Sequence, residues 1–284
     1  MESNFNNSGH GRSLIGVGGA VLLLAVSAVA AATGLWKVLV VSLVAFAAMA
    51  LGALLGTRSE TTSPHGLVWG YGLASGAMVT SASLFLLPQA IGLGGTGAPR
   101  VGGLGVAVGL LAGYSAHTIS HRLTHIDTSF DLAAVQITAH ALAAGAIIGL
   151  IYGSMPTLGL LLGVAIVSHK GPAGYAAARR LRRRGKSATA LLLPAAGVGI
   201  TAIPVALFPV PAVPAVNAAV FGFAAGIFLH VAMDFLPHCE AGSEIHEVCS
   251  LQEGSHHLLD ELRTHAVAST GVGGLLVVAA WLVV

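Results

Sequence analysis

Residues 140–174 read HALAAGAIIGLIYGSMPTLGLLLGVAIVSHKGPAG, and this stretch decides the class of fold. Two apolar runs flank a short connection at residues 153–156, and each run is long enough to cross a hydrocarbon core about 30 Å thick. His140 precedes the centre of the connection by as many residues as His169 follows it. At the rise of an α-helix, each histidine lies roughly 20 Å from the turn. The pattern predicts a helical hairpin in a membrane, with two imidazoles at one depth.

The composition of the whole chain also indicates a membrane protein. Of 284 residues, 55% are hydrophobic and 8% are charged, against about 25% charged in a soluble globular domain. A disordered protein or a nucleic-acid binder needs many more charges. The 38 glycines favour helices that approach one another closely, and the absence of regular alternation argues against a membrane β-barrel. Two cysteines are too few for a disulfide framework. We therefore expect an all-α polytopic membrane protein.

Nine apolar segments qualify as transmembrane helices by their length. They are 14–33, 37–56, 66–92, 99–118, 131–152, 157–180, 188–209, 213–237 and 265–284. A cleaved signal peptide is the alternative for the first segment, because small residues follow at 27–32, but its apolar region exceeds the usual length of roughly 7–15 residues. We expect residues 1–36 to form an N-terminal tail and an extra helix, and residues 37–284 to form the main domain.

Lysines and arginines in the short connections predict the orientation of the chain. With the N-terminus inside, ten basic residues are cytoplasmic: Arg12, Arg58, Arg122, Arg179, Arg180, Arg182, Arg183, Arg184, Lys186 and Arg263. Only Lys37 and Arg100 then lie outside. The basic run at 179–186 is expected to anchor this topology near anionic lipid. We expect a multi-pass protein of the cell membrane with a cytoplasmic N-terminus and a C-terminus outside.

Five ionisable residues fall inside the predicted spans, where a charge costs several kcal/mol and usually faces the bundle interior. They are His140, His169, Lys170, His230 and Asp234, with Gln89 and Gln136 as uncharged companions. Pro172 cannot donate to the carbonyl four residues earlier, which leaves an oxygen beside His169 as a candidate cation ligand. Structural roles are the alternative: interhelical hydrogen bonds for the histidines, snorkelling of Lys170 or its salt bridge with Asp234, and local pairing of His230 with Asp234.

These segments resemble the ZIP (Zrt/Irt-like) family of divalent metal transporters. That family carries an HNxx(D/E)G motif on one central helix and HExP(H/E)(E/G) on the next, which supply ligands to a binuclear site. Residues 140–145 (HALAAG) and 169–174 (HKGPAG) stand at these positions, while 76–89 and 228–237 look like the family's second and seventh core helices. The resemblance covers residues 37–284. It implies a 3+2+3 bundle of eight core helices whose outer triplets are inverted repeats, with 14–33 as the additional N-terminal helix of some members.

The chain departs from the family motifs at the residues that carry charge. Ala141, Ala144, Lys170 and Ala173 stand where the family has its asparagine and acids. Without those carboxylates and with an added ammonium, a binuclear dication site is disfavoured. Three outcomes stay open: a single-ion site, a different substrate with Lys170 in place of one metal's charge, or a family fold that no longer transports. The expected metal ligands are His140, His169, and Met78 or Asp234, and the expected pathway residues are Gln89, Gln136, Lys170 and His230.

Histidines also gather in two segments expected to be cytoplasmic loops, 117–130 and 238–264. His117, His121 and His125 recur every four residues, so one continuous helix would align them, and an i,i+4 pair can chelate a zinc-sized ion. The second segment mixes glutamates with histidine and cysteine, which suits labile soft-metal binding in a reducing compartment. Those histidines and cysteines are His238, Cys239, His246, Cys249, His256 and His257. A merely solvated polar loop is the alternative for both segments.

The sequence and the resemblance together predict transport of a divalent metal cation, zinc or similar, toward the cytoplasm by alternating access. We expect no enzymatic activity, no prosthetic group and no nucleic-acid partner. The metal ion is the expected substrate, the lipid bilayer is the expected surrounding, and a homodimer is left open. Two alternatives remain. One is a ZIP-fold metal-binding or scaffold protein without transport; the other is a membrane di-iron oxidase, for which the chain lacks an HxxHH box.

Overall fold

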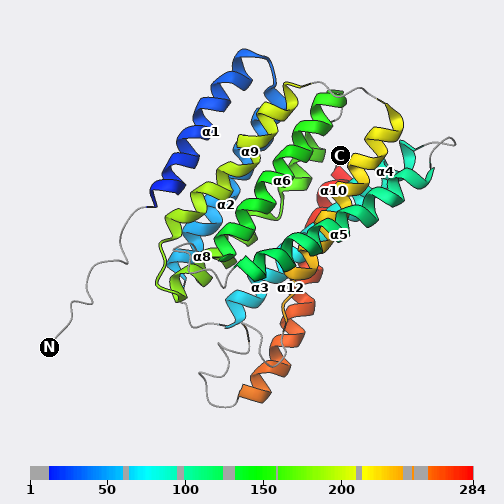
Figure 1. The fold of residues 1–284 in the computed structure, drawn as a ribbon. Coiled ribbons are helices and arrows are strands. Elements are labelled where there is room, and N and C mark those ends of the chain that lie inside the picture. Colours follow the sequence, from blue (N-terminus) through cyan, green and yellow to red (C-terminus); the bar gives the residue numbers. More distant parts are fainter. Residues whose placement is uncertain are drawn as a thin grey trace.

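The computed structural model describes residues 13–59, 64–94, 99–123, 132–157, 159–208, 213–238, 245 and 255–283. The regular structure of these residues is helical throughout (Figure 1). The helices are α1 (Leu14–Ala32), α2 (Trp36–Arg58), α3 (Pro64–Ser81), α4 (Leu87–Gly92), α5 (Pro99–Leu123), α6 (Leu132–Ser154), α7 (Leu160–Val167), α8 (Lys170–Arg183), α9 (Leu192–Ala206), α10 (Pro214–Asp234) and α12 (Ser255–Val283). A π-helical segment, η1 (Ala82–Leu86), joins α3 to α4, and a 3₁₀ turn, η2 (Ala188–Leu191), precedes α9.

Prolines and glycines determine where several helices begin and end. Pro64, Pro99 and Pro214 are the first residues of α3, α5 and α10, where a helix needs no amide hydrogen. Gly34 and Gly185 have φ angles of 76° and 66° in the turns after α1 and α8. Glycine adopts this left-handed conformation without the steric cost that a Cβ would add.

Two further prolines interrupt helices inside the bundle. Pro88 lacks the hydrogen that would reach back into η1, and the chain adopts the wider π-helical form there. Pro172 lies in the first turn of α8, and the helix is interrupted just before it, at Ser168 and His169. The segment 157–180, which the sequence predicts as one span, is therefore two helices with His169 at the junction.

Seven helical segments are long and apolar enough to cross a membrane, judged by length and composition. They are Leu14–Ala32, Trp36–Arg58, Pro64–Gly92, Ile137–Ser154, Ala188–Ala206, Pro214–Asp234 and Leu258–Leu282. The prediction of an all-α protein is confirmed for the described residues, and seven of the nine expected spans correspond to helical segments that could cross a membrane. In the other two, the apolar part of α5 is shorter, at Arg100–Ala116, and 157–180 is divided between α7 and α8.

Four helix pairs make the most extensive interfaces: α2 with α8, α6 with α9, α3 with α12, and α5 with α10. Glycine lets the backbones approach in these pairs. A Cβ on Gly76 would overlap the carbonyl oxygen of Thr270 on α12, and one on Gly149 would overlap that of Ala202 on α9. The same holds for Gly52 against Gly171 and for Gly226 against Val106. The expectation of closely approaching helices is therefore confirmed.

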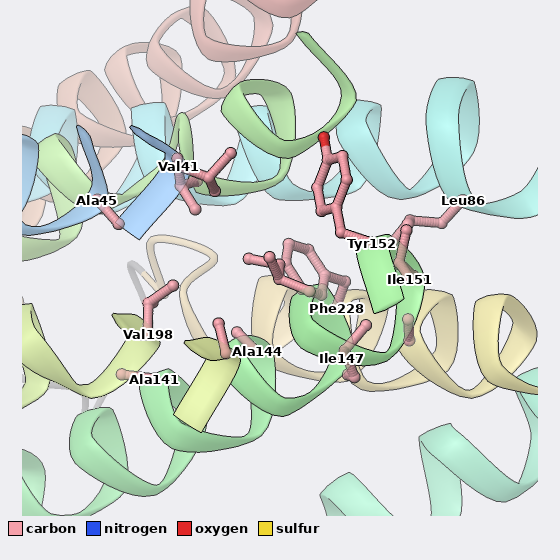
Figure 2. Close-up of a cluster of buried hydrophobic side chains, with 14 of the residues drawn as sticks. Val41, Ala45, Leu86, Ala141, Ala144, Ile147, Ile151, Tyr152, Val198 and Phe228 are labelled. Atoms are coloured by element: carbon pink, nitrogen blue, oxygen red, sulfur yellow. The ribbon is translucent and has the colours of Figure 1, made fainter. Parts of the chain in front are cut away.

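The largest apolar cluster draws on α2, α6, α9 and α10. Figure 2 shows Phe228 of α10 beside Ala144, Ile147 and Ile151 of α6. These three residues of α6 are at most 4% exposed, and they follow His140 along one face of the helix toward Ser154. An apolar seal, defined here as Ala144, Ile147 and Ile151, therefore lies between His140 and the α6–α7 turn.

Candidate metal centre

His140 and His169 meet in the interior of the bundle, as their positions in the sequence predict. Their Nε2 atoms are 3.4 Å apart and their ring centroids are 5.6 Å apart. His169 is 2% exposed. Two nitrogens that share a tetrahedral zinc ion at 2.0–2.1 Å are separated by about 3.3 Å, so this spacing fits one ion between them.

The two imidazoles do not come from helices that pack directly on each other. The main partner of α6 is α9, and the main partner of α8 is α2. The gap between α6 and the α7–α8 junction is bridged by the side chains themselves, with Phe228 of α10 against both. Its ring centroid is 5.8 Å from that of His140 and 5.5 Å from that of His169, in edge contacts. The ring of Phe228 therefore covers the histidine pair on the side that faces α10.

One ring nitrogen of His140 is left unsatisfied. His140 Nδ1 is buried, and no hydrogen-bond partner for it exists among the described residues. Buried polar atoms nearly always have a partner, so each exception needs an explanation. The ring can shift or change tautomer when an ion takes Nε2, because no fixed hydrogen bond holds the other nitrogen.

The residues one and four positions after His140, and the residue four positions after His169, are apolar. Ala141, Ala144 and Ala173 are all buried, and none exceeds 4% exposure. Ala141 lies against Gly197 of α9. Alanine side chains supply no oxygen ligand, so only main-chain groups are available to an ion at these positions.

Lys170 is the charged residue closest to the pair in the chain, and it is 2% exposed. The sequence offered a salt bridge to Asp234 as one role for it. Asp234 instead contacts His230, with its Oδ2 atom 3.4 Å from Nε2 of the histidine. No carboxylate within the described ranges forms a salt bridge with Lys170. The Lys170–Asp234 salt bridge, one of the roles left open for Lys170, is therefore not formed in this conformation. Asp234 is the last residue of α10, and its side chain is 35% exposed.

The other expected site residues have different neighbours in the structure. Met78 is fully buried in the apolar cluster that contains Phe228. His230 packs against Gly113 and Tyr114 of α5. Gln89 is half-buried on α4, beyond the π-helical segment. Among described contacts, no hydrogen bond joins Met78, Gln89 or His230 to His140.

Several predicted ligands cannot be placed. The backbone at 117, 121 and 136 lies on α5 and α6, but the side chains of His117, His121 and Gln136 are outside the described residues, as is all of His125. Cys239, His246 and Cys249 also lie outside the described residues, as do the side chains of His256 and His257. Both histidine-rich segments are more helical than expected, since α5 continues to Leu123 and α12 begins at Ser255.

A cavity of about 190 Å³ borders the α7–α8 junction. Ser168 and Pro172 of the junction line it together with Leu73 and Ala77 of α3 and residues of α12. Its lining is almost wholly apolar, so it offers an ion few ligands.

The structure also joins three residues that the sequence did not bring together. His65, at the start of α3, meets Glu261 and His265 of α12, which lie four residues apart on one helix face. The i,i+4 spacing of Glu261 and His265 was a signal in the sequence. The contribution of His65 depends on the packing of α3 against α12, which local pattern cannot reveal.

Comparisons with known proteins add no argument about this site. No protein-family model matches the chain, and a search of curated proteins finds no match either.

Proposed function

We propose that this chain transports a divalent metal cation, zinc or a similar ion, across the membrane by alternating access, with His140 and His169 as ligands at the substrate site. The observation that carries the proposal is the 3.4 Å separation of the two Nε2 atoms inside the bundle. A separation of that size suits one ion held by two imidazoles. The unpartnered Nδ1 of His140 gives that ring freedom to adjust to an ion.

The interrupted helix supports the proposal. Transporters commonly bind substrate where a helix is broken, because main-chain groups there are available to a ligand. His169 lies at such a break, between α7 and α8, with Pro172 in the next turn. The second histidine therefore lies directly before the start of α8, at the break between the two helices.

The pairing of helices supports a ZIP-like arrangement with internal repeats. In such an arrangement, α2, α3 and α5 correspond in that order to α9, α10 and α12, and α6 corresponds to the α7–α8 unit. The α2–α8 interface then corresponds to the α9–α6 interface. In the same way, the α3–α12 interface corresponds to the α10–α5 interface. These are the four most extensive interfaces, so the contact pattern has the symmetry expected of inverted repeats. In this arrangement, α1 is the extra N-terminal helix.

The charges favour one ion rather than two. No carboxylate comes from either motif, and a protonated Lys170 beside a dication is repulsive by several kcal/mol even at an effective dielectric of about 20. The ion therefore needs Lys170 to release its proton or to turn away. In the described conformation the buried residues of the apolar seal lie between His140 and the α6–α7 turn, so transport along this face of α6 requires movement of α6 relative to its neighbours.

A metal-binding or scaffold protein without flux is the second candidate. The buried ammonium and the missing carboxylates favour it, since both weaken metal binding at the pair. In that case the His140–His169 contact is an interhelical hydrogen bond.

Uptake into proteoliposomes separates these functions. The purified chain is reconstituted, and the entry of Zn²⁺, Mn²⁺, Fe²⁺, Co²⁺ and Cd²⁺ is followed against protein-free vesicles. Saturable entry of at least one of these ions supports transport. If every ion enters at the rate of protein-free vesicles while the protein still binds zinc, the transport proposal is wrong and the scaffold function stands.

A further inference from the structure

A cluster of imidazole and carboxylate groups lies far along the chain from both motifs, at the end of the α3–α12 pair where Pro64 begins α3. We propose that His65, Glu261 and His265 form a second binding site, for a divalent transition-metal ion of the zinc type. This group is called the end cluster below. The proposal does not rest on the transport function, because it depends only on these residues and their neighbours.

The three side chains already converge on one point. His65 Nε2 is 3.3 Å from Glu261 Oε1, and His265 Nε2 is 3.8 Å from the same oxygen. One ligand atom from each residue lies within 4.8 Å of the others. The two imidazole rings meet edge to face at 4.9 Å. An ion would draw the atoms together by about 1 Å, a movement open to half-exposed side chains.

The helices hold the end cluster on a firm base. Glu261 and His265 are four residues apart on α12, so both point to the same face. Below them α12 packs closely on α3, where Ser269 Oγ donates to the carbonyl of Val68 at 3.3 Å. The buried side chains of Val68, Ile245, Leu259 and Leu262 form an apolar cluster there. Ligands mounted on packed helices are positioned better than ligands on loops.

The donor set is typical of metal sites that keep an open coordination position. Two imidazole nitrogens and one carboxylate oxygen bind zinc in catalytic sites and iron(II) in oxygenases, with water at the remaining positions. The end cluster carries the negative charge that the His140–His169 pair lacks. Its side chains are 36–55% exposed, so an ion can reach them from solution.

Trp69 connects the end cluster to a measurable signal. Its indole Nε1–H donates to His265 Nδ1 at 3.2 Å. Because Nδ1 accepts that hydrogen bond, a neutral His265 carries its own hydrogen on Nε2, toward Glu261. When a metal takes Nε2, that hydrogen is lost to solvent, and the neutral imidazole takes one up on Nδ1. Nδ1 can then no longer accept from the indole, so Trp69 loses its hydrogen bond and its fluorescence changes.

The test is zinc binding by the purified full-length chain in detergent, carried out in a His140→Ala/His169→Ala background. This background removes the proposed transport ligands, so failure of one proposal leaves the other intact. Equilibrium dialysis gives the number of zinc ions bound, and fluorescence during the same titration reports on Trp69. We expect a fluorescence change that saturates with one ion per chain.

Single substitutions assign that ion. We expect the zinc affinity to fall by about tenfold or more in each of the variants His65→Ala, Glu261→Gln and His265→Ala. The fluorescence change at the original zinc concentration should then be lost. Asp260→Asn is the matched control, because this substitution removes the same charge from the same turn of α12. Asp260 lies outside the end cluster, where it pairs with Arg263 at 2.6 Å. Trp69→Phe should abolish the signal while zinc still binds.

Two results would overturn the proposal. One is an unchanged zinc stoichiometry and affinity in all three ligand variants. The other is equal weakening by Asp260→Asn and Glu261→Gln, which would mean that general negative charge, and not the end cluster, attracts the ion. Gel filtration of each variant shows whether a loss of binding reflects a loss of fold, and for a misfolded alanine variant His65→Gln takes its place.

Discussion

The His140–His169 pair and the end cluster use the same side chain in opposite surroundings. The pair lies against Phe228 and is followed in the chain by the buried Lys170, and the nearby positions Ala141, Ala144 and Ala173 carry no polar side chain. The end cluster is half-exposed and contains Glu261. A site that must hold an ion without trapping it benefits from weak ligation, whereas a site that collects ions from solution benefits from charge and access. The two regions therefore suit passage and capture, respectively.

The largest expected effect is the loss of zinc binding at the pair. With the end cluster removed by His65→Ala, Glu261→Gln and His265→Ala together, His140→Ala and His169→Ala should each weaken the remaining binding by about 100-fold, because one imidazole alone is a poor site. The double variant should be little worse than either single, since two ligands of one ion act as a unit. Calorimetric titration in detergent measures these affinities. Additive losses would show that the histidines bind separate ions.

The next effect tests why the pair is the weaker site. Lys170→Met removes the buried ammonium and should strengthen zinc binding at the pair by about tenfold, since like charges in a low-dielectric interior repel strongly. Lys170→Glu adds a carboxylate at the position where the ZIP motif has one, and should strengthen it further while slowing release. The same titration measures both. An affinity unchanged in Lys170→Glu would place Lys170 outside the pathway and would remove the electrostatic part of the account.

A packing change should destabilise the α3–α12 pair, which carries the end cluster. Gly76→Ala places a Cβ against the carbonyl oxygen of Thr270, so α3 and α12 must separate, at a cost of about 1–3 kcal/mol. Thermal unfolding in detergent measures the loss. Gly18→Ala on α1 is the control, because its Cβ meets nothing within 4 Å. If Gly76→Ala unfolds at the wild-type temperature, the close α3–α12 contact does not determine the stability of this region.

The smallest expected effect concerns Asp234. A Lys170–Asp234 pair would make Asp234→Asn severe, because a buried ammonium would lose its partner. In the structure Asp234 is part-exposed and contacts His230. Asp234→Asn should therefore cost less than about 1 kcal/mol of stability and leave zinc binding at the pair unchanged. A large loss of stability or of zinc affinity would indicate that Lys170 and Asp234 form a salt bridge in another conformation.

The comparison also shows what the sequence reveals and what it does not. His140 and His169 flank one short turn, so the helical rise alone predicts their common depth. The interruption before Lys170 follows from Pro172, yet its effect on 157–180 depends on how α7 and α8 pack. The partner of Asp234 and the convergence of His65 with Glu261 depend on contacts between distant helices. Sequence periodicity specifies the buried face of a helix but not the helix that covers it.

Zinc uptake by proteoliposomes tests the central claim most directly when the two regions are compared in one experiment. His140→Ala and His169→Ala are measured beside His65→Ala, at equal protein incorporation. The account predicts that saturable uptake is lost in the first two variants and retained in the third, because only the buried pair binds the ion in transit. Uptake at the wild-type rate in His140→Ala and His169→Ala would contradict it.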